Sequence, residues 1–262
     1  MAEGDGVSFA KLKIRIEKMQ ETSFNPTQLA HMDTERLTAY RTNLDFYKGN
    51  QWPTTSRHRQ LVFNYAKVSI DKVTSFLMQG FTFSCFPAKE DQDVLTRVRR
   101  AEQVLHQVYQ ENNFAQLDYE TEIDTAILGD GCYKVIWDHD VQRIRITAPD
   151  VSGIFAWWLG DDLSRVWRVA SRYQLTRDEI QMLYGDVIAS VAKQSQGIAT
   201  SPRFIGAPRN NVVVTELWTD KTFDLYLDTD LIESRPNPYG FIPFIIFPKM
   251  LDVKVSSCGS AT

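Results

Sequence analysis

Four aspartates near the middle of the chain are close enough in sequence to be candidates for metal binding and hydrolysis. They are Asp124, Asp130, Asp138 and Asp140, and His139 stands between the last two. Carboxylates joined by a histidine hold divalent cations in hydrolases and nucleases. The spacing favours a structural explanation, because Asp138 and Asp140 flank an expected hairpin tip and Asp130 stands between two glycines. A metal-dependent hydrolase or nuclease is therefore kept as an alternative, and the sequence predicts neither a metal nor a cofactor.

The cysteines and glycines give no catalytic signature either. Cys85, Cys132 and Cys258 form no C-x-x-C pair, and their scatter favours a reducing compartment. Cys132 falls on an expected strand and has no histidine nearby in register. We therefore expect its side chain to be buried and to act as a small hydrophobic residue. The stretch 129–131 fails as a phosphate loop, because a helix precedes it and a strand follows.

A basic cluster, Arg57-His58-Arg59, is where basic and aromatic side chains interleave most tightly, with Trp52 and Tyr65 nearby. Such a cluster is a candidate for contact with DNA phosphates or with acidic groups of a neighbouring subunit. A solvated loop explains the same residues, since charge runs in loops usually face water. All three interpretations stay open at this point.

The pattern at 64–80 predicts the helix around which the chain is organised. Asn64 can cap its first turn, and Gly80 can end it in a left-handed conformation. Its large apolar side chains fall on one stripe, which we expect to be buried in the core. The stripe consists of Tyr65, Val68, Val73, Phe76 and Leu77. Alternation of apolar and polar residues at 81–85 then predicts a strand.

Helical spacing and strand-like alternation of apolar residues both recur through the rest of the chain. Helices are expected from Asp33 or Thr34 onward, over 94–109, over 114–128 with a stop at Gly129, and from a capping box at 176–179 to Gly185. Hairpins are expected over 133–146 and 212–227, with strands at 155–159 and 166–173 and a loop at 193–211. The expected fold class is α+β, a helical N-terminal half followed by antiparallel hairpins.

Composition bounds the class of protein. The chain has 262 residues, 43% of them hydrophobic and 24% charged, which is typical of a globular protein. Its formal charge of −4 argues against tight, static binding of DNA. No apolar run is long enough to cross a bilayer and no leader pattern opens the chain, so we expect a protein made and used in the cytosol. We expect an N-terminal arm at 1–32, one α+β domain at 33–249 and an irregular tail at 250–262.

One apolar segment close to the C-terminus is a candidate subunit interface. Six large apolar side chains occupy seven positions, interrupted only by Pro243. They are Phe241, Ile242, Phe244, Ile245, Ile246 and Phe247. This density is too high for a strand with one face in water, so we expect a partner surface to cover the second face.

Four segments of the chain resemble, in order, landmarks of the portal proteins of tailed bacteriophages. The first contains YKGNQ and RQLVFNYAKVSIDKVTSFL followed by FTF. The others are YETEIDTAILGDGCYKVIWD, RIRITAPDVSGIF and YGFIPFIIF. The resemblance runs from about residue 33 to about residue 249, and no single phrase in it is a catalytic motif.

The resemblance implies a structural subunit rather than an enzyme. Portal proteins form a homo-oligomeric, twelve-fold ring at one vertex of the virion, assembled in the host cytoplasm, through which double-stranded DNA is packaged and ejected. Their partners are the large terminase subunit, which hydrolyses ATP, the major capsid or scaffolding protein, and a tail adaptor. This chain is similar to the wing portion, with a portal wing-like α+β fold and no role for a membrane.

The chain departs from the family at its end. Portal proteins continue past the YGFIPFIIF phrase into stem, clip and crown, whereas this sequence ends in LDVKVSSCGSAT. We expect a truncated product, a frameshifted tail or a separate short gene. The competing functional hypotheses are the metal-dependent hydrolase and a soluble module that binds nucleic acid.

Overall fold

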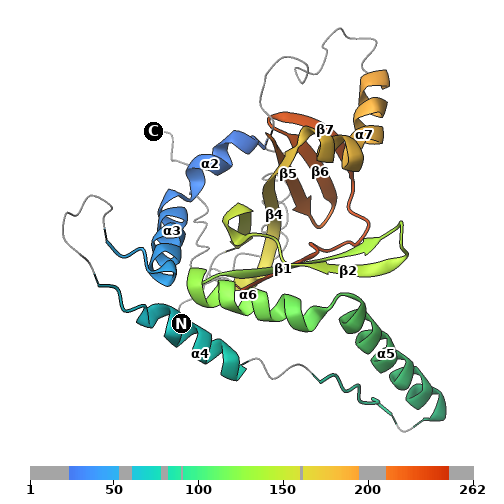
Figure 1. The fold of residues 1–262 in the computed structure, drawn as a ribbon. Coiled ribbons are helices and arrows are strands. Elements are labelled where there is room, and N and C mark those ends of the chain that lie inside the picture. Colours follow the sequence, from blue (N-terminus) through green and yellow to red (C-terminus); the bar gives the residue numbers. More distant parts are fainter. Residues whose placement is uncertain are drawn as a thin grey trace, which may run out of the picture. The chain divides into compact units, whose positions relative to one another are not determined.

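A computed structural model of the chain describes residues 24–52, 61–77, 82–89, 91–159, 162–194 and 211–247. It confirms the α+β class, with helices in the first half and antiparallel sheets after them (Figure 1). The chain divides into two compact units. Of the described residues, 34–154 and 243–247 form what we call the helical unit, and 24–33 and 155–242 form what we call the sheet unit.

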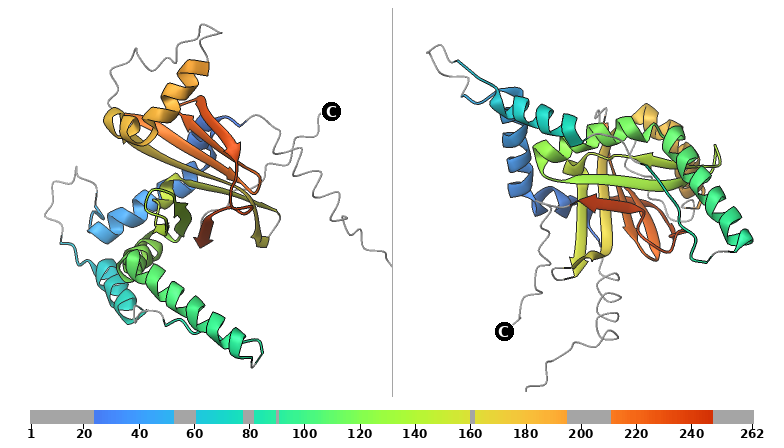
Figure 2. Two further views of the ribbon diagram at one scale, coloured as in Figure 1. Left: turned by 90° about the vertical axis from the view of Figure 1, so that its right-hand side faces the viewer. Right: turned by 90° about the horizontal axis from the view of Figure 1, so that it is seen from below.

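The helical unit combines four helices with a three-stranded sheet. The helices are α3 (Thr34–Lys48), α4 (Tyr65–Leu77), α5 (Gln92–Glu111) and α6 (Phe114–Leu128). The strands are β1 (Gly131–Asp138), β2 (Arg143–Thr147) and β8 (Phe244–Phe247), and the short 3-10 helix η2 spans Val151–Gly153. The strand order is β2-β1-β8 with antiparallel pairing, so β8 is an edge strand beside β1 (Figure 2). Helix α6 contacts the other three helices and β1.

Local signals place the boundaries of these elements. Helix α6 ends at Gly129, whose φ of 96° lies in the left-handed region that glycine adopts without strain. Asn64 caps α4 by accepting a bond from the Lys67 amide at 3.1 Å. At the tip of the β1–β2 hairpin, Asp138 accepts bonds from the amides of Asp140 at 3.0 Å and Val141 at 3.3 Å. The expected cap at Asn64, the expected stop at Gly129 and the turn role of Asp138 are confirmed.

A buried polar cluster fastens α3 to the start of β1. The Tyr40 hydroxyl donates to the carboxylate of Asp130, and the Arg36 guanidinium donates to the Tyr40 hydroxyl at 2.9 Å. Arg36 also donates to the backbone carbonyls of Val151 and Ile154, each at 3.0 Å. Asp130 is therefore more than a turn residue, because its buried carboxylate anchors a helix that lies far away in the sequence.

The sheet unit is built on a five-stranded antiparallel sheet in the order β3-β4-β5-β6-β7. Its strands are β3 (Ile154–Leu159), β4 (Asp162–Thr176), β5 (Asn211–Thr219), β6 (Thr222–Leu227) and β7 (Asp230–Pro236). Its helices are η1 (Pro26–Gln28), α2 (Leu29–Met32) and α7 (Arg177–Gln194), the last of which contacts β4 and β7. Apolar side chains from the middle strands, such as Val169, Val214 and Leu225, are fully buried.

Three details differ from the sequence-based expectations. The described part of the strand expected at 81–85, residues 82–85, forms no strand, because its backbone is not paired in either sheet. Helix α7 begins with the expected capping box, in which the Thr176 amide donates to Glu179 at 2.7 Å, but it continues past Gly185 to Gln194. Strand β7 was not expected, although it pairs with β6 along its length.

Several of the sequence-based expectations concern residues outside the described ranges. These are Arg57, His58 and Arg59, the helix stop at Gly80, and most of the loop at 193–211, the arm at 1–32 and the tail at 250–262. Within the part of the chain that the structure describes, no helix has the length and apolar character needed to cross a membrane.

Candidate subunit interface

Helix α4 turns its apolar stripe toward solvent. Tyr65 is 72% exposed and Phe76 is 64% exposed, and Val68, Val73 and Leu77 are exposed as well. The one buried residue of the helix is Thr74, which lies on the side opposite Tyr65 and Phe76. The expectation that this stripe belongs to the core is therefore wrong. Apolar side chains gathered on one exposed helix face are typical of a surface that a partner covers.

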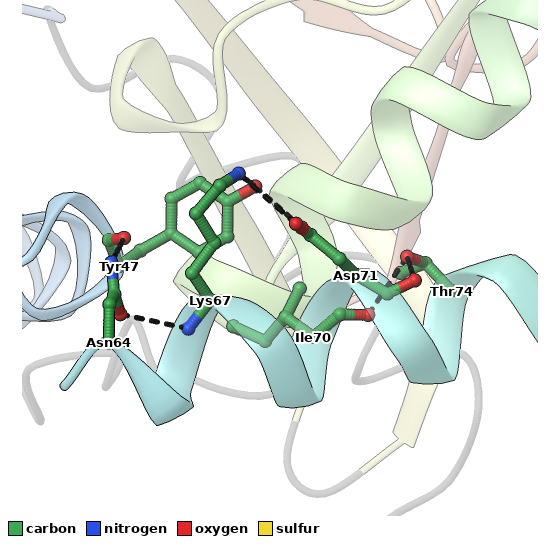
Figure 3. A network of polar contacts seen from close by, with 6 residues as sticks. All are labelled: Tyr47, Asn64, Lys67, Ile70, Asp71 and Thr74. Atoms are coloured by element: carbon green, nitrogen blue, oxygen red, sulfur yellow. Dashed lines mark hydrogen bonds and ion pairs between the residues drawn. The ribbon is translucent and has the colours of Figure 1, made fainter.

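Polar contacts attach one side of α4 to α3 (Figure 3). The Tyr47 hydroxyl on α3 donates to the Asp71 carboxylate at 2.9 Å and accepts from the Lys67 ammonium at 3.0 Å. Lys67 and Asp71 also pair at 3.2 Å, and Asn64 donates to the Tyr47 carbonyl at 2.7 Å. These bonds hold the polar face of α4 against α3, so the apolar stripe has to face outward.

The same contacts shift the ionisation of the pair. The hydrogen bond from Tyr47, together with one from Lys67, holds the pKa of the Asp71 carboxyl below its usual range. The bond to Tyr47, followed by the one to Asp71, raises the pKa of the Lys67 ammonium. Both groups are therefore charged at neutral pH, and α4 presents a charged side to α3 and an apolar side to solvent.

A second apolar surface of the helical unit is an open groove with a volume of about 560 Å³. One face of the three-stranded sheet forms its floor, because the strand register sets Val135 opposite Ile146 and Tyr133 opposite Ile245. Helices α5 and α6 and the segment around Phe83 supply the walls. The lining consists of Phe83, Leu105, Val108, Tyr109, Phe114, Asp118, Thr121, Glu122, Thr125, Tyr133, Val135, Ile146, Ile245 and Phe247.

Aromatic rings run in sequence along this groove. Phe83 contacts Tyr109 with ring centroids 5.5 Å apart, and Tyr109 contacts Phe114 at 5.4 Å. Phe114 in turn contacts Tyr133 at 5.3 Å, and Tyr133 contacts Phe247 at 5.7 Å. These edge-on and tilted contacts join α5, α6, β1, β8 and the segment around Phe83 into one apolar surface.

Two acidic side chains, Asp118 and Glu122, stand in the mainly apolar lining. The Asp118 carboxylate accepts a bond of 2.6 Å from the Tyr133 hydroxyl, and Glu122 lies one turn further along α6. Burial, and then the bond to Asp118, raises the pKa of the Tyr133 hydroxyl, so it donates at every physiological pH. Among the described residues that line the groove there is no lysine, arginine or histidine, so its charge is negative.

The C-terminal apolar segment is divided between the two units. Phe241 and Ile242 belong to the sheet unit, where the Phe241 ring lies 5.8 Å from the Tyr239 ring. Strand β8 belongs to the helical unit, and Ile245, 52% exposed, lines the groove together with Phe247. Phe244 and Ile246 are half-buried, and the Lys134 ammonium lies 5.8 Å from the Phe244 ring centroid.

The four aspartates have separate surroundings. Asp130 is bound by Tyr40, Asp138 is bound into the hairpin turn and pairs with Arg145 at 3.7 Å, and Asp140 takes part in that turn through its amide. Burial and the nearby carboxylates of Asp150 and Glu120 raise the pKa of Asp124. In the described ranges, no group of three His, Cys, Asp or Glu side chains is arranged to hold a metal ion.

The groove was not among the features that the sequence predicted. A signal for it was present in α5, whose pattern is strongly amphipathic although the helix has no buried residue. Comparison with known proteins adds no relative: no family model matches the chain, and no curated protein matches it.

Proposed function

We propose that this chain is a structural subunit of a phage portal ring, corresponding to the wing part of the portal. The observation that carries the proposal is α4. The segment that contains this helix bears the longest resemblance to portal proteins, and its apolar stripe lies on the surface of the folded unit. A ring subunit needs such surfaces, because each copy has to bury apolar area against two neighbours.

The exposed side chains of β8 support the same proposal. This strand lies in the YGFIPFIIF segment, at the edge of its sheet, with Ile245 and Phe247 both exposed. An edge strand with apolar side chains is a liability unless another chain covers it. The proposed subunit therefore has two uncovered apolar surfaces in two of the segments that resemble the family.

The proposal includes the partners that a portal ring requires. They are eleven further copies of the chain in a twelve-fold ring, the large terminase subunit, a capsid or scaffolding protein, a tail adaptor and passing double-stranded DNA. In this proposal the virion vertex is the site of action and the chain has no catalytic role. No observation among the described residues favours the hydrolase or the nucleic-acid module over this role.

Electron microscopy of the purified chain, combined with mass photometry, tests the proposal. We expect closed rings with a central hole and masses that are multiples of the 30.1 kDa chain. Met182 on α7 is 86% exposed and lies in the sheet unit, so Met182→Asp serves as a control that leaves the rings intact. A chain that stays monomeric throughout the micromolar range would contradict the proposal.

A further inference from the structure

The groove and the α4 stripe are two different apolar surfaces on one folded unit. The stripe is convex, with Tyr65, Val68 and Phe76 following the spacing of one helix face. The groove is concave and built from other elements, namely α5, α6, β1, β2 and β8. Helices that bind in grooves use anchors at this spacing. A groove of about 560 Å³ falls in the size range that accepts several large side chains.

Charge makes the two surfaces complementary. The groove contains Asp118 and Glu122. The exposed face of α4 carries Lys72, whose ammonium lies 4.9 Å from the centroid of the Phe76 ring. The acid of this helix, Asp71, is turned toward Tyr47 and Lys67. The stripe is thus an apolar face with one cation, and the groove is an apolar surface with two carboxylates. Opposite charges on two apolar surfaces favour their association and determine the orientation in which they bind.

We propose that the α4 stripe of one copy docks in the groove of a second copy of this chain. The inference rests on the proposed function and specifies its subunit contact. Because the two surfaces differ, the contact is head-to-tail: each copy uses its stripe toward one neighbour and its groove toward the other. Repetition of a contact of this type closes into a ring when the rotation per copy allows it. One contact then covers both exposed surfaces of every subunit.

Two double variants test the contact by complementation. The stripe variant carries Val68→Asp and Phe76→Asp, and the groove variant carries Leu105→Asp and Ile245→Asp. All four positions are at least partly exposed, so both variants are expected to fold, which circular dichroism checks. Each variant alone should be monomeric by mass photometry. An equal mixture should form a one-to-one dimer and nothing larger, because only one intact stripe and one intact groove meet.

The outcomes separate this inference from the proposed function. If the parent chain forms rings and either folded variant forms them equally well, the docking is overturned while the portal role stands. A mixture of the two folded variants that stays monomeric also overturns the docking. If instead the mixture dimerises while the parent never closes into rings, the docking holds and the portal role fails.

Cross-linking gives a second readout that needs no stable assembly. In a chain with Cys85→Ser and Cys258→Ser, one sample carries Phe76→Cys and another carries Leu105→Cys. When the two chains are mixed under oxidising conditions, we expect a disulfide to form between the two introduced cysteines. Met182→Cys replaces Phe76→Cys in the control, and equal cross-linking there would overturn the docking.

Charge exchange tests the orientation of the docked helix. Adding Lys72→Glu to the groove variant, which supplies the intact stripe, should weaken the mixed dimer by about tenfold, because like charges then meet in the contact. Adding Glu122→Lys to the stripe variant, which supplies the intact groove, should restore most of the affinity. Failure to restore it would overturn the pairing of this stripe with this groove.

Discussion

Cys132 is a thiol whose surroundings make it unreactive. It is 1% exposed on β1, and burial raises the pKa of its thiol to about 12. Because the thiolate is the reactive form, we expect iodoacetamide at mildly alkaline pH to modify Cys132 roughly ten times more slowly than the half-buried Cys85. Peptide mass spectrometry after timed quenching measures both rates. In urea the two rates should converge, and equal rates in the native protein would contradict the expected burial.

Tyr40 supplies a hydrogen-bond donor to the buried Asp130. Burial, and then the bond to Asp130, raises the pKa of the Tyr40 hydroxyl, so it stays protonated and donates. Tyr40→Phe leaves the buried carboxylate without this donor, which should lower the free energy of unfolding by about 1–3 kcal/mol. Urea unfolding followed by circular dichroism measures the change. Tyr119→Phe, at an exposed position on α6, is the matched control and should change little.

Asp71 makes a pH-dependent contribution to the free energy of unfolding, and the sign of this contribution follows from the shift of its pKa. Hydrogen bonds from Tyr47 and Lys67 lower the pKa of the folded carboxyl. The contribution to stability is therefore present above the ordinary aspartate pKa and is lost as pH falls through the lowered folded value. We expect Tyr47→Phe to raise the pKa of Asp71 toward its ordinary value in an NMR titration of the side-chain carboxyl. An unchanged titration curve would mean that Tyr47 does not hold this carboxylate.

At the scale of the element, α4 determines how the stability of the helical unit responds to mutation. Its apolar stripe is exposed in the single chain, so at protein concentrations where the chain is monomeric Phe76→Ala should change the free energy of unfolding by no more than about 0.5 kcal/mol. Ile127 is buried on α6 in the same unit, and Ile127→Ala should cost about 2–5 kcal/mol. Urea titration of both variants against the parent makes the comparison. Equal losses would restore the earlier expectation that the stripe belongs to the core.

The junction between α6 and β1 contrasts with the segment at 82–85. At the junction, Gly129 and the change from helical to alternating periodicity act within a few residues, and the structure agrees with the pattern. At 82–85 an equally clear alternation forms no strand. The Phe83 ring instead contacts His106 at 5.8 Å and Tyr109 at 5.5 Å on α5. Alternation specifies a strand only where a neighbouring strand is available to pair with it.

At the scale of the whole molecule, the net charge of −4 predicts how strongly the chain binds DNA. Tight binding would require many phosphate contacts from lysine and arginine. We expect fluorescence anisotropy with a labelled duplex at physiological salt to show no saturable binding below micromolar concentration. Saturable binding that weakens steeply with added salt would favour the nucleic-acid module instead.

The sequence by itself determined the type and most of the ends of the elements. Helices α3, α5 and α6, the β1–β2 hairpin and the β5–β6 hairpin all follow from periodicity, caps and turn residues. These signals act between residues close together in the chain, such as Asn64 with Lys67 or Asp138 with Asp140. Local interactions were sufficient to determine these elements, because the interacting groups are close in sequence and contact each other independently of the rest of the fold.

Only the tertiary structure decided which surfaces are buried. The apolar stripe of α4 faces outward because Tyr47, from another helix, binds the polar face. Asp130 is an anchor because Tyr40 reaches it from α3, and the groove exists because β8 returns to pair with β1. Each of these facts depends on groups that are distant in sequence. A side-chain pattern states that a face is apolar, but the contacts available in the folded chain determine whether that face meets the core or a second molecule.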